Sequence, residues 1–431
     1  MAALYRLCNP PAEGMAERNP NAIALSFALV PIAGSLAGFV YVLLVCWAAI
    51  SLVVGRLKWR SFGAAAPILW SHVAFFAVLF LVDLIKADPV VALREAGLRL
   101  FFLMPLIAVH RVAISDPRRV FDAVFKGAVI GGLLVPVVAF GQMIVTGEPR
   151  AAGLAGNAGP FSIVCLLTAG LAALALEGRR TPIFNALALL ATAGASLGVV
   201  LSGMRGAWPA LFIVLALVLW FRRGEIASSW RGSSLRRRLM VALSGLAVLA
   251  AVVVTGYGVA LDRIAQFVTD FRQLATDADI ASSLSLRAEM YQAGVEAYLD
   301  APLIGVGKPG LWDALKPHLG AAFDGSYGFS HLHNIFLTVG VQAGLLGLLA
   351  LVAMLSAPIL CAYRTRMRPA GRVRLAAALV LVIAYLVPGL TNIMFFHDIL
   401  DAVWALSIWT IAGTIMSEDR DIGVDPQEAR A

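Results

Sequence analysis

The chain has 431 residues, of which 60% are hydrophobic and only 14% are charged, and its mean hydropathy is +0.85. A water-soluble domain cannot bury so much apolar surface, so the composition indicates a polytopic membrane protein. The net charge of +8 does not indicate a nucleic-acid partner, because the basic residues lie in short loops between apolar runs. The four cysteines have neither metal-ligand spacing nor an evident disulfide framework.

Long apolar runs recur along the chain, and two of them are too long for one span of roughly 20 residues. The run at 22–54 carries Pro31 and Gly34 in its middle, and the run at 182–221 is interrupted by SGMRG at 202–206. Each is therefore predicted to fold as two helices, which gives an all-α protein with about 12 transmembrane helices. The ten runs lie at about 22–54, 64–85, 89–109, 120–145, 159–176, 182–221, 239–260, 332–362, 375–395 and 399–416.

Basic residues are concentrated in every second loop, for example at 56–60, 111–119 and 364–374. The positive-inside rule places such loops in the cytoplasm, so both termini are predicted inside and the alternate loops outside. The predicted organisation is transmembrane helices 1–9 in residues 1–260, a periplasmic helical loop in 261–330, transmembrane helices 10–12 in 331–416 and a cytoplasmic tail in 417–431.

The long external loop carries two predicted helices. The first, at 262–276, places Ile264, Phe267, Val268 and Phe271 at helical spacing. This pattern is typical of an amphipathic helix that lies on the membrane or covers the bundle.

The second predicted helix of the loop runs over about 285–299 and ends before Pro302. Arg287, Tyr291 and Tyr298 share one of its faces. An arginine and two tyrosines could hold a phosphate and stack on sugar rings. Packing of the tyrosines against the bundle explains the same spacing.

Few basic residues occur in the predicted external loops, so each is informative. Arg150 precedes a glycine-rich turn, Arg205 lies between two short spans, and Arg287 lies in the long loop. Each could anchor in lipid headgroups. However, a guanidinium near hydrocarbon needs an anionic partner, and its planar fork suits a diphosphate. Lys86 and Arg94 are weaker candidates for phosphate contacts, since Arg94 and Glu95 could pair with each other within the fourth span.

The stretch GFSHLHNIFLTVGVQAGLLGLL at 328–349 places two histidines at the outer end of an apolar run. His331 and His333 are two residues apart, so on a helix they would point about 200° away from each other. No third ligand has zinc spacing, so a metal site is not expected. A neutral imidazole suits a general base, whereas the alternative is a structural histidine at headgroup level.

This stretch resembles the ligase signature of the O-antigen ligase family, within the O-antigen ligase and polymerase superfamily. The signature is a histidine, then Asn, Ser or Gln, nine residues, and Gly-x-x-Gly, and here it runs from His333 and Asn334 to Gly344 and Gly347. RAAGLAGNAGP, SGMRGAW and APLIGVG are also similar. Some members continue with two threonines, where this chain has leucines at 348–349.

The resemblance implies a GT-C-like glycosyltransferase of the bacterial inner membrane that acts on the periplasmic face without a cofactor. Its substrates would be a glycan on undecaprenyl diphosphate and a sugar hydroxyl of lipid A–core, within the surrounding membrane lipids. On this hypothesis the expected catalytic residues are His333, Arg205 and Arg287, with His333 as the base of an inverting, metal-independent transfer. The expected substrate-binding residues are Arg150, Asn334, His331, Lys86, Arg94, Tyr291 and Tyr298.

Three alternative functions are an O-antigen polymerase, a protein O-oligosaccharyltransferase and a secondary transporter. An O-antigen polymerase or a protein O-oligosaccharyltransferase would use the same donor and a similar site. A secondary transporter would show internal repeats and polar groups near the bilayer midplane. The chain shows neither, because its candidate residues gather at one predicted face.

Overall fold

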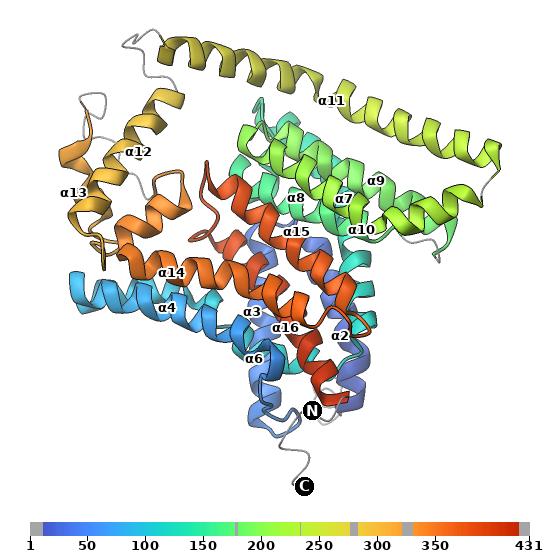
Figure 1. Cartoon of the computed structure of the whole chain (residues 1–431), viewed down its shortest axis with the longest axis horizontal. Helices are drawn as coiled ribbons and strands as arrows, with labels where there is room; N and C mark the ends of the chain where they lie inside the picture. Colours follow the sequence, from blue (N-terminus) through green and yellow to red (C-terminus); the bar gives the residue numbers. More distant parts are fainter. Residues whose placement is uncertain (1–11, 177–179, 233, 276–282, 321–330, 422–431) are drawn as a thin grey trace.

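A computed structural model of the chain describes residues 12–176, 180–232, 234–275, 283–320 and 331–421, and this part is all helical (Figure 1). The expected all-α class is confirmed. The α-helices are α2 Ala12–Leu29, α3 Ser35–Val53, α4 Ala66–Lys86, α5 Pro89–Leu98, α6 Pro105–Val112, α7 Pro117–Thr146, α8 Ala158–Leu174, α9 Pro182–Leu201, α10 Trp208–Arg231, α11 Leu235–Ala275, α12 Ser283–Asp300, α13 Leu311–Leu315, α14 Ile335–Arg364, α15 Gly371–Gly389 and α16 Asp398–Asp421. Short 3-10 turns are η1 Gly63–Ala65, η2 Leu100–Phe102, η3 Gly153–Ala155, η4 Arg205–Ala207 and η5 Lys316–His318.

The two long apolar runs divide where the sequence predicts. α2 and α3 are separated at Gly34, whose φ of +56° disfavours any residue with a side chain. A Cβ at Gly34 would also overlap the carbonyl of Leu154, so the break seats this turn against the turn that holds η3. The second run ends α9 at Leu201 and resumes as α10 at Trp208.

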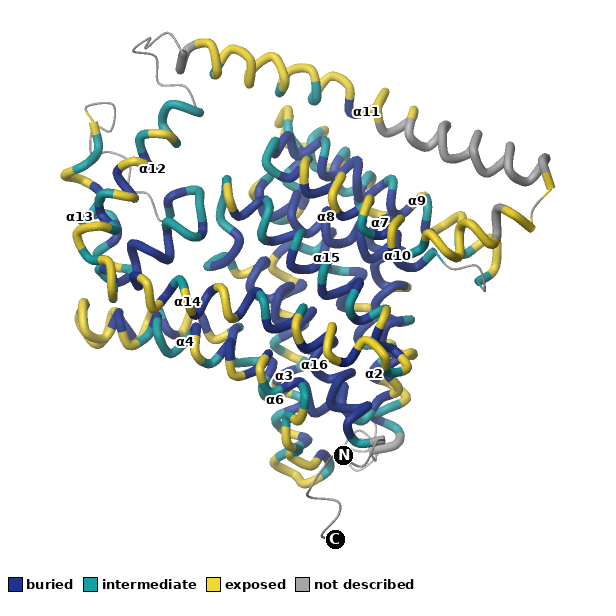
Figure 2. The backbone as a smooth tube through the Cα atoms, in the orientation of Figure 1, coloured by how far each residue is buried: buried dark blue, intermediate teal, exposed yellow. Residues whose placement is uncertain are grey.

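The central helix α16 lies in the interior of the bundle, with Trp404 and Trp409 almost fully buried (Figure 2). At 1.5 Å per residue, its Asp398 and Asp419 lie roughly 32 Å apart. That length matches the hydrocarbon core of a bilayer, about 30 Å thick. α16 therefore separates two ends of the molecule by one membrane thickness.

The basic loops meet at the C-terminal end of α16. Asp419 accepts a hydrogen bond from the backbone N–H of Ala64 at 2.8 Å and pairs with Arg368 at 2.6 Å. Glu418 pairs with the buried Arg374 at 2.8 Å. At the other end, Asp398 accepts a hydrogen bond from Ser35 at 2.5 Å. Two of the predicted basic loops thus meet at one end of α16, and the start of α3 lies at its other end.

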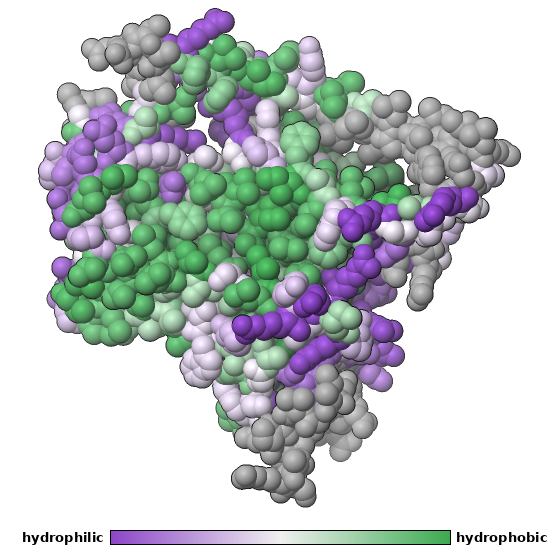
Figure 3. Space-filling view, in the orientation of Figure 1, coloured by the Kyte–Doolittle hydropathy of each residue, from purple (hydrophilic) through white to green (hydrophobic). Residues whose placement is uncertain are grey.

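Seven helices of the described chain are long and apolar enough to cross a membrane, and two shorter apolar helices accompany them. The chain is therefore a polytopic α-helical membrane protein, and an apolar surface covers α4 and α14 (Figure 3). The finding does not establish the expected count of about 12.

The predicted span at 89–109 is wrong as a single helix. It divides into α5, η2 and α6, and Pro105 opens α6. A proline lacks the backbone N–H that a continuous helix would need at this point, and it favours the first turn of a new helix.

The segment that was predicted to be external also differs from its prediction. Residues 239–260 and 262–276 were expected to form a span and a separate amphipathic helix, but α11 continues through both as far as Ala275 (Figure 1). The expected apolar stripe is present, yet Ile264, Phe267 and Phe271 stay exposed and do not pack into the bundle.

α14 is broken at Gly344, the first glycine of the Gly-x-x-Gly signature. Its φ of +60° is non-helical, and a Cβ there would overlap the carbonyl carbon of Leu303. The backbone of Leu345 donates to the carbonyl of Pro302 at 2.8 Å, and Val306 donates to the carbonyl of Val341 at 2.9 Å. The break thus admits the 302–307 loop as a backbone partner of α14.

Candidate functional site

α12 positions its polar face by burying the opposite one. Met290, Ala293 and Ala297 are at most 2% exposed, and they pack against a cluster that contains Leu332 and Val341. The helix predicted over about 285–299 is confirmed. Because this face is fixed, Arg287 and Tyr291 are held beside the turn that precedes α14.

The three arginines that the sequence singles out lie together, and a fourth joins them. The charges of Arg263, Arg205 and Arg287 all act on Arg150. Gly203, with φ of +62°, leaves room for two of these side chains: a Cβ there would lie 2.9 Å from Nε of Arg263 and 3.1 Å from Nε of Arg150. We call Arg150, Arg205, Arg263 and Arg287 the arginine cluster.

Each member of the arginine cluster comes from a different element. Arg150 follows α7 and donates through Nε to the carbonyl of Ser202 at 2.8 Å. Arg205 opens η4 and forms a 3.1 Å ion pair with Asp270 of α11. Arg205 also lies over the ring of Phe267, 5.6 Å from its centroid. Two turns and two helices therefore converge on one cationic surface.

Burial and mutual repulsion lower the pKa of two of these arginines. For Arg150, burial is the largest cause, followed by the charges of Arg263, Arg205 and Arg287. For Arg287, burial again lowers the pKa most, and Arg205 adds to it, while Tyr291 and Asp270 act in the opposite sense. Among the described residues whose charges act on these two groups, Asp270 is the one carboxylate. Such a set of like charges favours binding of a multiply charged anion.

His333 lies next to the arginine cluster, held in an unusual backbone conformation. Its φ is +49°, which costs free energy for a residue with a side chain. Tyr291 donates its hydroxyl to the carbonyl of His333 at 2.9 Å. Asn334 then starts α14 by accepting from the N–H groups of Phe336 and Leu337. The strained histidine is thus fixed from both sides.

The prediction that the two histidines diverge is wrong. Both lie in the turn before α14, not on a helix, and their rings are 4.4 Å apart between centroids. Burial lowers the pKa of His331 to about 3, with His333 and Lys308 as further causes. Burial, followed by the charge of Arg287, lowers the pKa of His333, while the hydrogen bond that its ring donates to Asn392 raises it. Both imidazoles are therefore neutral at neutral pH.

Two of the expected substrate contacts are engaged in the fold. The Nδ2 group of Asn334 donates to the carbonyl of Leu390 at 3.2 Å, and its Oδ1 caps α14. The ring of Tyr298 covers Gly340 of α14, where a Cβ would lie 3.3 Å from the ring. Packing against the bundle therefore describes Tyr298, whereas Tyr291 lies between Arg287 and His333.

Lys86 and Arg94 do not join the arginine cluster. Both side chains are exposed, and neither is among the charges that act on Arg150 or Arg287. Arg94 does not lie on one long span as expected, because its helix α5 has only 10 residues, about half the length that a span needs. The buried cation of this region is Arg99, which pairs with Asp83 at 2.6 Å.

Three residues of this region were not singled out from the sequence. Arg263 and Asp270 belong to the helix that was expected to be merely amphipathic, and their polar spacing of seven residues on one face is the signal that could have found them. Asn392 lies 3.4 Å from the Nδ1 atom of His333. It is 59 residues from that histidine in the chain, and no local pattern marks it.

Among the described residues, no group of three or more His, Cys, Asp or Glu side chains could hold a metal ion.

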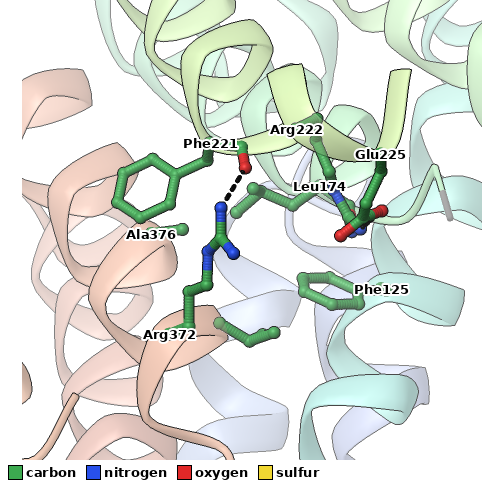
Figure 4. A pocket seen from close by; sticks show the side chains of 8 residues that line it. Phe125, Leu174, Phe221, Arg222, Glu225, Arg372 and Ala376 are labelled. Carbon is green, nitrogen blue, oxygen red and sulfur yellow. Dashed lines mark hydrogen bonds and ion pairs between the residues drawn. The ribbon is translucent and has the colours of Figure 1, made fainter. Parts of the chain in front are cut away.

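One pocket lies apart from the arginine cluster. A pocket of about 40 Å³ opens between α7, α8, α10 and α15 on the side of the basic loops, where Arg372 donates to the carbonyl of Phe221 (Figure 4). Its volume is far below the several hundred Å³ of typical ligand sites, so it is a packing feature.

The helices, the two charged ends and the site together define a polytopic membrane protein with a cationic, histidine-bearing site at one end. Residues 187–352 match a family model described as O-Antigen ligase. The resemblance found from the sequence is thereby confirmed for these residues, which are similar to a family of the O-antigen ligase or polymerase type. The match covers Arg205, Arg263, Arg287 and His333, and it ends in α14 beyond the Gly344 break. No curated protein matches the chain.

Proposed function

We propose that the protein is an O-antigen ligase, which transfers a glycan from undecaprenyl diphosphate to a sugar hydroxyl of lipid A–core. The observation that carries the proposal is the convergence of Arg150, Arg205 and Arg263 with Arg287, whose charge also acts on His333. In a transfer from a diphosphate carrier, a cationic surface can bind the departing diphosphate, and a neutral histidine can accept the proton of the acceptor hydroxyl. The family match supports the class of reaction.

The arginine cluster is the proposed diphosphate end of the site. Guanidinium groups donate two parallel hydrogen bonds to phosphate oxygens and remain charged in a partly buried site. As the bond between the anomeric carbon and the phosphate oxygen breaks, negative charge grows on the departing diphosphate. The cluster would stabilise that charge in the transition state more than in the ground state.

His333 is the proposed base. The acceptor hydroxyl would attack the anomeric carbon while its proton passes to a ring nitrogen of His333, so that one C–O bond forms as another breaks. The reaction is a single displacement with inversion. The lowered pKa of His333 keeps the ring unprotonated and able to accept the proton at neutral pH.

We further propose that the site faces the periplasm. The basic loops gather at the Asp419 end of α16, whereas Asp398, at the opposite end, pairs with His397 next to the site. Basic loops favour the cytoplasmic side of the inner membrane. The site would then lie where glycans on undecaprenyl diphosphate and lipid A–core are both displayed.

The experiment that tests the function compares acceptors. Purified protein in proteoliposomes receives a glycan on undecaprenyl diphosphate together with lipid A–core, with the donor alone, or with a peptide acceptor. The proposal predicts transfer to lipid A–core only. Growth of the donor glycan without another acceptor would instead assign a polymerase, and modification of the peptide would assign a protein O-oligosaccharyltransferase.

A further inference from the structure

Asn392 connects the two halves of the candidate site. It lies in the turn between α15 and α16, where Thr391 contacts the bare Cα of Gly206, next to Arg205. The Nδ2 group of Asn392 lies 3.7 Å from the sulfur of Met204. Its Oδ1 atom faces Nδ1 of His333 at 3.4 Å. One turn thus touches both the loop of Arg205 and the histidine.

The orientation of the Asn392 amide is set by its own backbone. The N–H of Ile393 donates to Oδ1 of Asn392 at 2.8 Å, which identifies that atom as the oxygen. An oxygen can only accept, so the hydrogen between Asn392 and His333 must be carried by Nδ1 of the histidine. In a neutral imidazole the lone pair is then on Nε2.

From this geometry we infer that Asn392 is a positioning residue, which holds His333 in the tautomer whose Nε2 is free to accept a proton. The inference rests on the proposed function, because it assigns Asn392 a role only if His333 is the base. The backbone of His333 is held separately, through Tyr291 and the Asn334 cap. Asn392 therefore supplies what these contacts do not, namely the protonation pattern and the rotation of the ring.

Close packing keeps Asn392 in place. A Cβ on Gly159 would lie 2.6 Å from Nδ2 of Asn392, so the start of α8 approaches the amide through a bare Cα. Among the described residues, the charge of Arg287 acts on His333. The titratable groups beside it are His331, whose ring centroid is 4.4 Å from that of His333, and Tyr291, which donates to the His333 carbonyl. A change of charge at residue 392 should therefore shift the pKa of the His333 ring.

The test uses two substitutions of nearly equal size in the full-length protein. Asn392→Leu removes the acceptor, so kcat should fall about 10-fold, as expected for a lost hydrogen bond, and the acid limb of kcat/KM should move to lower pH. Asn392→Asp keeps the acceptor and adds a negative charge, so it should retain most of kcat and move the acid limb to higher pH by about one unit. Ile393→Val serves as the matched control from the same turn. In Asn392→Leu and Asn392→Asp the KM for donor and for acceptor should stay near the wild-type value.

Opposite shifts of the acid limb support the inference, because a merely structural role would not move the limb in two directions. If both variants keep the wild-type limb and kcat, or if both move it in the same direction, Asn392 is not a positioning residue. Should Asn392→Leu fail to fold, the shift in Asn392→Asp alone decides the question. Wild-type activity of His333→Ala would instead overturn the proposed function, whereas an inactive His333→Ala beside an unshifted Asn392→Asp overturns only this inference.

Discussion

The hydroxyl of Tyr291 donates to the main-chain carbonyl of His333 at 2.9 Å. This hydrogen bond joins α12, which carries Arg287 one turn earlier, to the turn that carries the proposed base. Since the φ of His333 is +49°, the contact also stabilises a backbone conformation that is otherwise unfavourable.

Tyr291→Phe should therefore lower kcat about fivefold, because it removes the hydrogen bond to His333, worth about 1 kcal/mol, without changing the ring. It also removes the longer contact of the hydroxyl with the carbonyl of Leu390, at 3.4 Å. Steady-state transfer assays on the purified variant measure the effect. Tyr298→Phe is the matched control on the same helix, since the Tyr298 ring packs on Gly340, and it should behave as wild type. Equal losses in both variants would contradict the role given to Tyr291.

Arg205→Ala should lower kcat/KM for the donor about 10- to 100-fold, the range expected for a hydrogen bond to a charged group. Arg205→Lys should recover only part of the loss, because an ammonium lacks the planar fork. The variants are compared by initial rates at fixed acceptor concentration. Arg94→Ala, at an exposed position outside the arginine cluster, is the control, and an equal loss there would refute the assignment of the cluster as the diphosphate end.

Asp270 pairs with Arg205 at 3.1 Å and thus occupies a position that an anionic ligand would compete for. Asp270→Asn should lower the donor KM severalfold, because it removes a negative charge that repels the diphosphate. Raising the salt concentration should narrow the difference from wild type. A higher KM in Asp270→Asn would show that the carboxylate orients Arg205 for binding instead.

Gly344→Ala should destabilise the protein severely. The φ of +60° is strained for alanine, and the added Cβ would meet the 302–307 loop backbone. A loss of more than about 2 kcal/mol is expected from strain and overlap together, seen as a lower Tm of the detergent-solubilised protein. Gly97→Ala, where a Cβ would meet nothing within 4 Å, is the helical control. An unchanged Tm in Gly344→Ala would refute the account of the signature glycine.

The sequence predicted most of the helices because their signals are local. The breaks at Gly34 and at 202–206 follow from residues that interrupt an apolar run, and α12 follows from its 3.6-residue period. The division of 89–109 was missed because hydropathy alone does not weigh Pro105 against its apolar neighbours. The continuity of α11 was missed because nothing in the sequence distinguishes a bend from a straight helix near Asp262.

In the candidate site, too, local features could be predicted from the sequence and contacts between distant segments could not. Arginines that are rare in their loops could be predicted singly, and the structure brings Arg150, Arg205 and Arg287 together. The contacts of these residues could not be predicted, because the pairing of Asp270 with Arg205 and of Asn392 with His333 joins segments that are distant in the chain. The prediction that His331 and His333 point apart was wrong, because it assumed a helix where the chain forms a turn.

The most direct test of the central claim is the rate of glycan transfer to lipid A–core by His333→Ala and His331→Ala, each reconstituted at equal amounts of folded protein. If His333 is the base, His333→Ala should lose at least about 100-fold in kcat, the lower range for general base catalysis. It should keep its donor affinity, because the arginine cluster is intact. Transfer by His333→Ala at the wild-type rate, or a greater loss in His331→Ala, would contradict the account.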